Sequence, residues 1–156
     1  MITNEILAYT AGIMDGEGSI CIAKSAPSVK NGTKSPSHWL QVGIINTNRE
    51  LIEWLEKTFG GHISDNSHSP SRKRQRPCWA WRVTSIQAKI FLQSIYPYLK
   101  IKKKQAKLAI EFQEKRNKIS NNGKQITNKG LSIKILQERE WYKQEIAKLT
   151  LGHRTA

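Results

Sequence analysis

Two acidic residues, Asp15 and Glu17, stand at the end of an apolar run, LAYTAGIMDGEG. The apolar residues recur with helical spacing, so we expect a helix that ends at these acids. Negative charge is disfavoured at the carboxyl end of a helix, and a cation would offset it. Carboxylate oxygens and the main-chain carbonyls beside Gly16 are ligands that hard divalent metals prefer. Gly16 and Gly18 are expected to take positive φ where the chain leaves the helix.

Three other interpretations of these acids compete with this metal site. A calcium-binding loop would need glycine at its sixth position and glutamate at its twelfth, where this sequence has Ile20 and Ala26. A pair of carboxylates acting on a sugar would need a fixed separation, which a spacing of two residues does not set. A glycine-rich turn that simply ends a core helix stays open on these residues alone.

The same helix carries small side chains on one face. Ala8, Ala11, Gly12 and Asp15 lie three or four residues apart, which places them together and would let another backbone approach closely. The other faces are apolar, so the helix is predicted to be buried on more than one side.

The first half of the chain continues with a predicted hairpin and a helix. Alternating apolar residues predict strands at Ser19–Lys24 and His38–Asn46, joined by a loop at 26–37 that is rich in Pro, Gly, Ser and Asn. The stretch Thr47–Glu50 has the spacing of a capping box, and Gly60-Gly61 ends the helix that follows it.

The second half repeats this order. Strands are predicted at His62–Asp65 and at Cys78–Val83, where the tryptophans are interpreted as core residues. Ser85 is expected to cap a helix that Pro97 stops. After a break at 120–123, Leu131–Leu149 is expected to form a separate C-terminal helix.

Lysines crowd the start of the helix that follows Pro97. They are Lys100, Lys102, Lys103, Lys104 and Lys107. Positive charge opposes the dipole at this end of a helix, so the placement suggests a phosphate partner. A solvated cluster is the alternative, and it explains Lys103 and Lys104 better than it explains Lys102.

The composition also indicates a polyanionic partner. The 156 residues include 26 Lys+Arg against 12 Asp+Glu, a formal charge of +14. No apolar run is long enough to span a membrane, and the first residues do not read as a signal peptide. Cys21 and Cys78 have neither metal-ligand spacing nor a disulfide pattern. We expect a protein that binds nucleic acid rather than a membrane and stays where it is made, in a prokaryotic cytoplasm or inside an organelle that encodes it.

The stretch Thr10–Gly18, TAGIMDGEG, resembles the signature motif of the LAGLIDADG homing endonucleases. Matching letters are Ala11, Gly12, Asp15 and Gly18, and Glu17 replaces the second aspartate. The order helix, strand, strand, helix, strand, strand, helix is that of the family's αββαββα core. The resemblance therefore implies an α+β fold with an antiparallel four-stranded DNA-binding sheet and a C-terminal helix. Residues 1–120 would form the core domain, and residues 121–156 a helical extension of the same domain.

The resemblance also implies roles for single residues. Glu17 would hold Mg²⁺, or another divalent cation such as Mn²⁺, with the Gly16 carbonyl as a second ligand. Lys102 matches the lysine that enters the family's active site, and Asn46 matches the polar position that orients the attacking water. Arg49 is expected to be a nearby cation.

Candidate DNA contacts come from the predicted sheet, its loops and a helix end. A curved β-ribbon can lie in the major groove and read base edges, while cations around it neutralise phosphates. The candidates are Lys24, Lys30, Asn31, Lys34, Gln41, Arg72, Arg74, Arg76, Arg82 and Lys103.

The expected function is site-specific, metal-dependent double-strand cleavage of DNA at a long, roughly palindromic target. Cutting two strands requires two sets of acids, and this chain has one motif, so a homodimer through Ala8, Ala11, Gly12 and Asp15 is expected. An RNA maturase or a relative that binds nucleic acid without cutting it is the alternative. A basic structural protein, such as one bound to ribosomal RNA, would explain the charge but not the acids.

Overall fold

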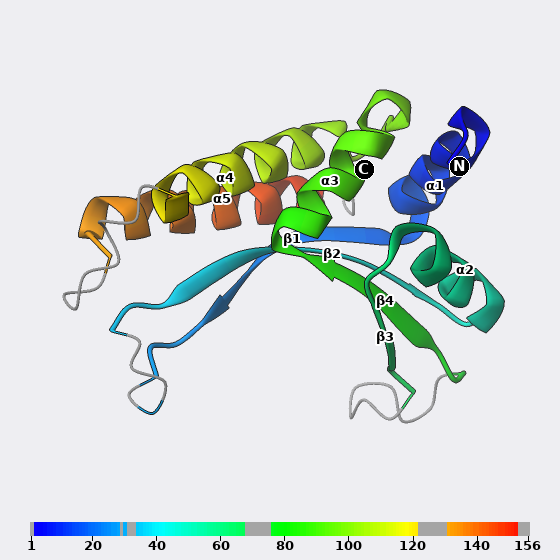
Figure 1. Ribbon diagram of the computed structural model, residues 1–156, viewed down its shortest axis with the longest axis horizontal. Helices are drawn as coiled ribbons and strands as arrows, with labels where there is room; N and C mark the ends of the chain where they lie inside the picture. Colours follow the sequence, from blue (N-terminus) through cyan, green and yellow to red (C-terminus); the bar gives the residue numbers. More distant parts are fainter. Residues whose placement is uncertain (1, 29, 31–33, 68–75, 122–130, 153–156) are drawn as a thin grey trace.

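Alternating apolar residues pair into a four-stranded antiparallel sheet with the strand order β1-β2-β4-β3. The structure, a computed structural model, describes residues 2–28, 30, 34–67, 76–121 and 131–152. Figure 1 shows the helices above the sheet, whose strands bend away from them at both ends to form an arch. The elements in chain order are α1 (Asn4–Glu17), β1 (Gly18–Ser25), β2 (Ser37–Asn46), α2 (Arg49–Phe59), β3 (His62–Asp65), β4 (Trp79–Thr84), α3 (Ser85–Ile95), the 3-10 turn η2 (Tyr96–Tyr98), α4 (Lys103–Asn121) and α5 (Ile133–Gly152).

The predicted order of helices and strands is confirmed, and with it the α+β fold class. The additional C-terminal helix is also present, as α5. The proposed division after residue 120 falls one residue before the end of α4, and residues 122–130 lie outside the described residues, so this division stays a prediction.

Strand alternation gives the sheet one apolar face and one open face. On the helical face, β1 and β2 bury Ile20 and Ile22 against Val42 and Leu40, and β4 continues this face with Val83. The neighbours of these residues along each strand point to the opposite, open face. The helices cover the apolar face, where the core therefore sits.

Aromatic side chains of α2, α3 and β4 pack together at one end of the core. Phe91 of α3 packs edge-on against Trp81 of β4 and Phe59 of α2, with ring centroids 5.0 Å and 5.1 Å away. The Trp81 indole also donates to the Gly60 carbonyl at 2.7 Å, which satisfies its buried N–H. The interpretation of Trp81 as a core residue is confirmed, since its side chain is fully buried.

Two predicted cap positions are wrong by one residue. Asn48, not Thr47, caps α2, because its side-chain oxygen accepts from the Leu51 amide at 3.1 Å. Ser85 is the first residue of α3 rather than its cap, and it has a φ of 51°. The cap position belongs to Thr84, whose side chain makes no capping hydrogen bond.

The glycines at the end of α1 do not take the expected positive φ. Gly16 is helical and Gly18 is extended, with φ of −74°. Gly18 is required for space instead, because a Cβ there would lie 2.2 Å from the Met14 sulfur and 2.6 Å from the Met14 carbonyl oxygen. The positive φ values among described glycines, 70° and 104°, belong to Gly60 and Gly61, which end α2 as predicted.

The C-terminal helix is fastened to the first hairpin by a polar cluster. Glu140 of α5 accepts from Lys24 at 2.9 Å and from Lys143 at 3.0 Å, and it contacts the ring nitrogen of buried His38 at 3.3 Å. The bonds from Lys24, Lys143 and His38 lower the pKa of Glu140 to about 2. Burial also lowers the pKa of His38, which keeps its ring neutral more readily.

None of the described helices is long and apolar enough to cross a membrane.

This cluster predicts a loss of stability in acid. Both pKa values are lowered by folding, so the unfolded chain binds the protons more tightly and the stabilising contribution is present at higher pH. It should fall first as the pH drops below the ordinary His38 value of 6.5, and again from 4.5 towards about 2 as Glu140 is protonated. Urea unfolding at about pH 7, 5 and 3 measures both steps. Glu140→Gln should abolish most of the second step and Glu56→Gln, at an exposed position, should not; equal losses in both variants would contradict the assignment.

Candidate active site

Glu17 ends α1 with its carboxylate held by a residue of β2. The Asn46 side-chain amide nitrogen donates to Glu17 Oε2. The side-chain oxygen of Asn46, Oδ1, accepts from the Asn48 backbone amide at 2.7 Å. The orientation of the Asn46 side-chain amide is therefore fixed from both sides. Because Asn48 also caps α2, one chain of polar contacts joins the start of that helix to the exposed acid.

An open hollow lies beside these two side chains. It has a volume of about 440 Å³, and its lining residues are Glu17, Ser19, Ile45, Asn46, Thr47 and Cys78. Four of them, Ser19, Ile45, Thr47 and Cys78, were not predicted as site residues. The signal available in the sequence for Ser19 was its position two residues after Glu17, at the start of the predicted strand. A hollow of this size has room for a phosphate group with water.

The Asp15 carboxylate binds the backbone just before α4. Its two carboxylate oxygens accept from the amides of Lys100 at 2.7 Å, Ile101 at 3.2 Å and Lys102 at 2.9 Å. These amides lead into α4, where a helix has donors without partners and a favourable position for negative charge. Asp15 therefore binds the segment that leads into α4, and this contact accounts for an acid at the carboxyl end of α1.

Lys102 makes the reciprocal contact. Its ammonium donates to the Asp15 main-chain carbonyl, in the last turn of α1. Burial lowers the pKa of Lys102 and the Asp15 charge partly offsets this. A cation thus lies where the dipole of α1 favours it. The carbonyl that it binds belongs to Asp15, two residues before Glu17 in the chain.

Arg49 lies beside the strand that carries Asn46. Its guanidinium binds Glu53 at 2.7 Å and stacks over the Trp79 ring, 5.8 Å from the centroid. Trp79 is the register partner of Asn46 in β4. Among the described residues, no contact joins Arg49 to Glu17.

The predicted DNA contacts divide between the two faces of the sheet. Gln41 and Arg82 lie on the open face, where Arg82 donates to Ser64 at 2.8 Å. Lys24 shares the parity of Ile20 and Ile22, so it lies on the helical face and pairs with Glu140. Lys30, Lys34, Arg76 and Lys103 are exposed, and the Lys103 ammonium lies 5.2 Å from the centroid of the Tyr96 ring. Asn31, Arg72 and Arg74 lie outside the described residues.

The open face is less basic than expected along its centre. Arg82 is the one lysine or arginine that the described parts of the strands place there. Its neighbours on this face are small or neutral, such as Cys21, Gln41 and Gly43. Of the other described cations among the predicted contacts, Lys24 lies on the helical face of β1, and the rest lie in loops and at a helix end.

The small-residue face of α1 splits in the structure. Ala11 is fully buried in the chain's own core, and Asp15 is bound to the residues before α4. Ala8 and Gly12 are exposed, and a Cβ added at Gly12 would meet nothing within 4 Å. A second backbone could therefore approach α1 along Ala8 and Gly12.

The donors at this site are compatible with a hard divalent cation that is shared with a substrate. The described residues contain no group of three or more His, Cys, Asp or Glu side chains that could hold a metal. Glu17 and the Gly16 carbonyl would supply two oxygen ligands, and Mg²⁺ commonly binds one or two carboxylates together with substrate phosphates and water. The open hollow beside Glu17 leaves space for those further ligands.

Comparison with known proteins rests on structure. No family model and no curated protein matches this chain. The homing endonuclease I-CvuI, in complex with a DNA target, matches at 18% identity with a TM-score of 0.69, over 92% of this chain and 80% of that one. The archaeal intron-encoded homing endonuclease I-Vdi141I, complexed with DNA, matches at 19% identity with a TM-score of 0.68, over 92% and 82%. The LAGLIDADG homing endonuclease I-GzeII, also bound to DNA, matches at 18% with a TM-score of 0.64, over 88% of this chain but 43% of that one. The chain therefore has the fold of the LAGLIDADG homing endonucleases.

Proposed function

We propose that this protein is a divalent-metal-dependent DNA endonuclease that makes site-specific double-strand breaks. The observation that carries the proposal is the exposed Glu17 carboxylate, oriented by Asn46 beside an open hollow, with the Lys102 ammonium at the same helix end. The DNA complexes of the structural neighbours I-CvuI and I-Vdi141I support duplex DNA as the substrate. Structures of I-CvuI were determined in the presence of Mg or Ca, which supports a divalent cation as cofactor.

The duplex would lie along the open face of the arched sheet. The arch is concave on the side away from the helices (Figure 1), and Gln41 and Arg82 are the polar side chains best placed near its centre. Lys30, Lys34 and Arg76, exposed beyond the strand ends, would neutralise phosphates on either side. Lys24, which is held by Glu140 on the helical face, is not included in this surface.

The scissile phosphate would enter the hollow beside Glu17. A Mg²⁺ ion bound there by Glu17 and the Gly16 carbonyl would supply positive charge for the phosphate and lower the pKa of water. The Asn46 amide nitrogen has two N–H groups, and the one not donated to Glu17 can hold a water molecule in line with the phosphate. The Lys102 ammonium has two donors beyond the one that the Asp15 carbonyl accepts, and these can stabilise charge on phosphate oxygens.

A second copy of the chain would complete the enzyme. One Glu17 serves one strand, and the exposed Ala8 and Gly12 leave α1 open to close contact with its symmetry mate. An isologous contact through this helix would bring two Glu17 side chains near one twofold axis, matched to a palindromic target. Matches that cover under half of a longer chain, such as I-GzeII, are consistent with a fold unit that works in pairs.

DNA binding should weaken steeply as salt is added. Each phosphate neutralised by Lys or Arg releases condensed counterions, so log K should fall by about 0.9 per contact for each unit of log salt. Fluorescence anisotropy with duplex DNA between about 50 and 200 mM salt measures the slope. A flat response would contradict the nucleic-acid proposal as a whole.

Glu17→Gln should remove cleavage and keep binding. The amide preserves the shape but loses the charge that holds the cation, so we expect the cleavage rate to fall at least about a hundredfold. A Mg²⁺-dependent plasmid cleavage assay, paired with anisotropy, separates the two properties. Glu56→Gln, an exposed change on α2, is the matched control. Normal cutting by Glu17→Gln would exclude this acid, and DNA binding without cleavage by the wild type would favour the maturase or non-cleaving alternative.

Gly12→Leu should separate the two copies. A Cβ at Gly12 would meet nothing within 4 Å in the same chain. Leucine is also a better helix former than glycine, which is about 0.8–1.0 kcal/mol less favourable than alanine, so the fold should be kept. The bulk would instead hold two α1 helices apart. Sedimentation should then give a monomer and cleavage assays a loss of double-strand breaks, whereas Gln137→Leu, at an exposed position on α5, should change neither. A wild-type monomer, both free and on DNA, would remove the basis for the dimer.

A further inference from the structure

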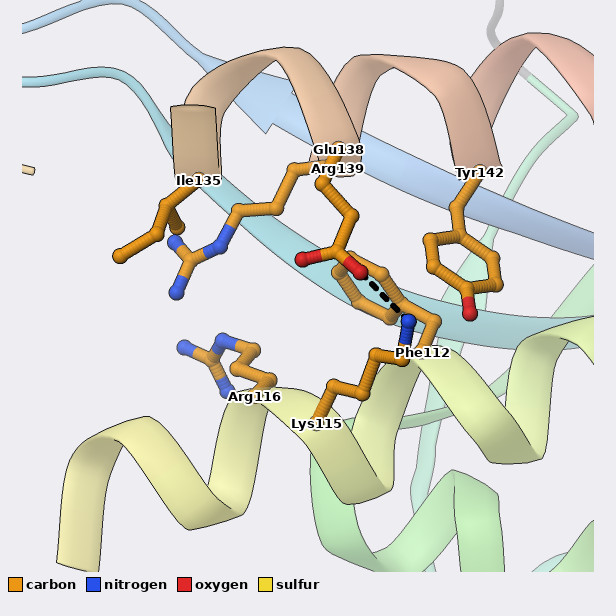
Figure 2. Close-up of a pocket in the computed structure, with 7 residues that line it drawn as sticks. All are labelled: Phe112, Lys115, Arg116, Ile135, Glu138, Arg139 and Tyr142. Carbon is orange, nitrogen blue, oxygen red and sulfur yellow. Dashed lines mark hydrogen bonds and ion pairs between the residues drawn. The ribbon is translucent and has the colours of Figure 1, made fainter. Parts of the chain in front are cut away.

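A narrow recess lies between α4 and α5, the two helices that cover β1. Its lining combines aromatic and aliphatic side chains with four charged ones (Figure 2). The lining residues are Phe112, Lys115, Arg116, Ile135, Glu138, Arg139 and Tyr142.

Two arginines face each other across this recess. Figure 2 shows the guanidinium groups of Arg116, from α4, and Arg139, from α5, directed towards one another. The carboxylate between the helices is already engaged, since Glu138 binds Lys115 at 2.5 Å. Within the described chain, neither Arg116 nor Arg139 has a carboxylate or other hydrogen-bond partner. The recess therefore holds two cations without an ion pair among the described residues. The nearby charge of Glu138, which is already bound to Lys115, partly offsets that of Arg139.

Burial makes this arrangement costly. Both arginines are half-buried, and burial lowers the pKa of each. The charge of Arg116 lowers the pKa of Arg139 further. Arginine does not give up its proton in proteins, so the repulsion cannot be relieved by neutralisation as it could for lysine. An anion bound between the two groups would relieve it.

Two aromatic side chains of the core line the recess. Phe112 and Tyr142 pack edge-on with ring centroids 5.9 Å apart, and both are buried in the core. Lys115 lies over the Tyr142 ring, 5.3 Å from its centroid, which keeps a third cation at the edge. Two planar guanidinium forks on a rigid base match the oxygens of a phosphate group, which Arg binds in bidentate fashion.

We propose that Arg116 and Arg139 bind a phosphate group at the mouth of this recess. The site is distinct from the one at Glu17: Arg116 is 13 residues after Lys103 (116 − 103), the first residue of α4, which is about 20 Å along the helix. The inference does not depend on the endonuclease proposal, because phosphate binding can be measured without cleavage.

Titration of the full chain with inorganic phosphate tests the site. At matched ionic strength, calorimetry should give saturable binding with phosphate and none with chloride. Arg116→Gln and Arg139→Gln should each weaken binding about tenfold or more, because each removes charge-assisted hydrogen bonds. Lys57→Gln removes one exposed charge from α2, away from the recess, and should leave binding unchanged.

Two further measurements guard against a merely structural effect. Arg139→Lys keeps the charge and loses the fork, so it should also bind more weakly while remaining folded. In phosphate-free buffer Arg139→Gln should unfold at no lower a temperature than the wild type, because the substitution removes a repulsion. Equal responses to phosphate and chloride, or wild-type binding by both Gln variants, would overturn the proposal.

Duplex DNA distinguishes the sources of the phosphate. If the ligand is the nucleic-acid backbone, Arg139→Gln should reduce the salt slope of DNA binding by about 0.9, the value of one contact. If the slope is unchanged while inorganic phosphate still binds, the ligand is a free phosphate or a phosphate monoester. Either result supports the phosphate site and assigns its source.

Discussion

The structure depends on a reciprocal exchange of charge between the end of α1 and the start of α4. Asp15 would be unfavourable at the end of its own helix, and lysines would be unfavourable at the start of theirs. Each helix supplies the charge that the other needs: the Asp15 carboxylate accepts three amides that lead into α4, and the Lys102 ammonium binds a carbonyl of α1. Two local penalties become one tertiary contact, which joins the end of α1 to the segment before α4.

The position of Glu17 follows from this contact. Its helix is anchored on one side by α4, and its carboxylate is anchored on the other by Asn46 of β2. Gly18 allows the turn between them, because the chain passes too close to Met14 for any larger residue. An acid that is exposed and yet held from two directions is preorganised, so little free energy is spent on ordering it when a substrate arrives.

Periodicity and composition predicted the fold because each element satisfies its local rules. Strand alternation at Ile20 and Ile22 and the double glycine after α2 left little choice of structure. Glu17 was a candidate metal ligand because of its place at the end of a helix, whereas the roles of Asn46 and Lys102 were predicted through the resemblance of the motif. The charge conflicts at Asp15 and the lysine run were visible in the sequence, but not that each resolves the other, because the two stretches are 85 residues apart. Lys24 shows the same limit: its parity is readable, whereas its partner Glu140 is 116 positions away.

One face of the sheet packs in the core and the other is open, and this separation affects how the sequence can evolve. Side chains such as Gln41 and Arg82 point away from the helices, whereas the adjacent Val42 and Val83 are packed in the core. A substitution on the open face leaves the packing on the other face untouched, so its effect on folding stability should be small. Substitutions on the open face can therefore accumulate one residue at a time while the core and the end of α1 at Glu17 stay unchanged.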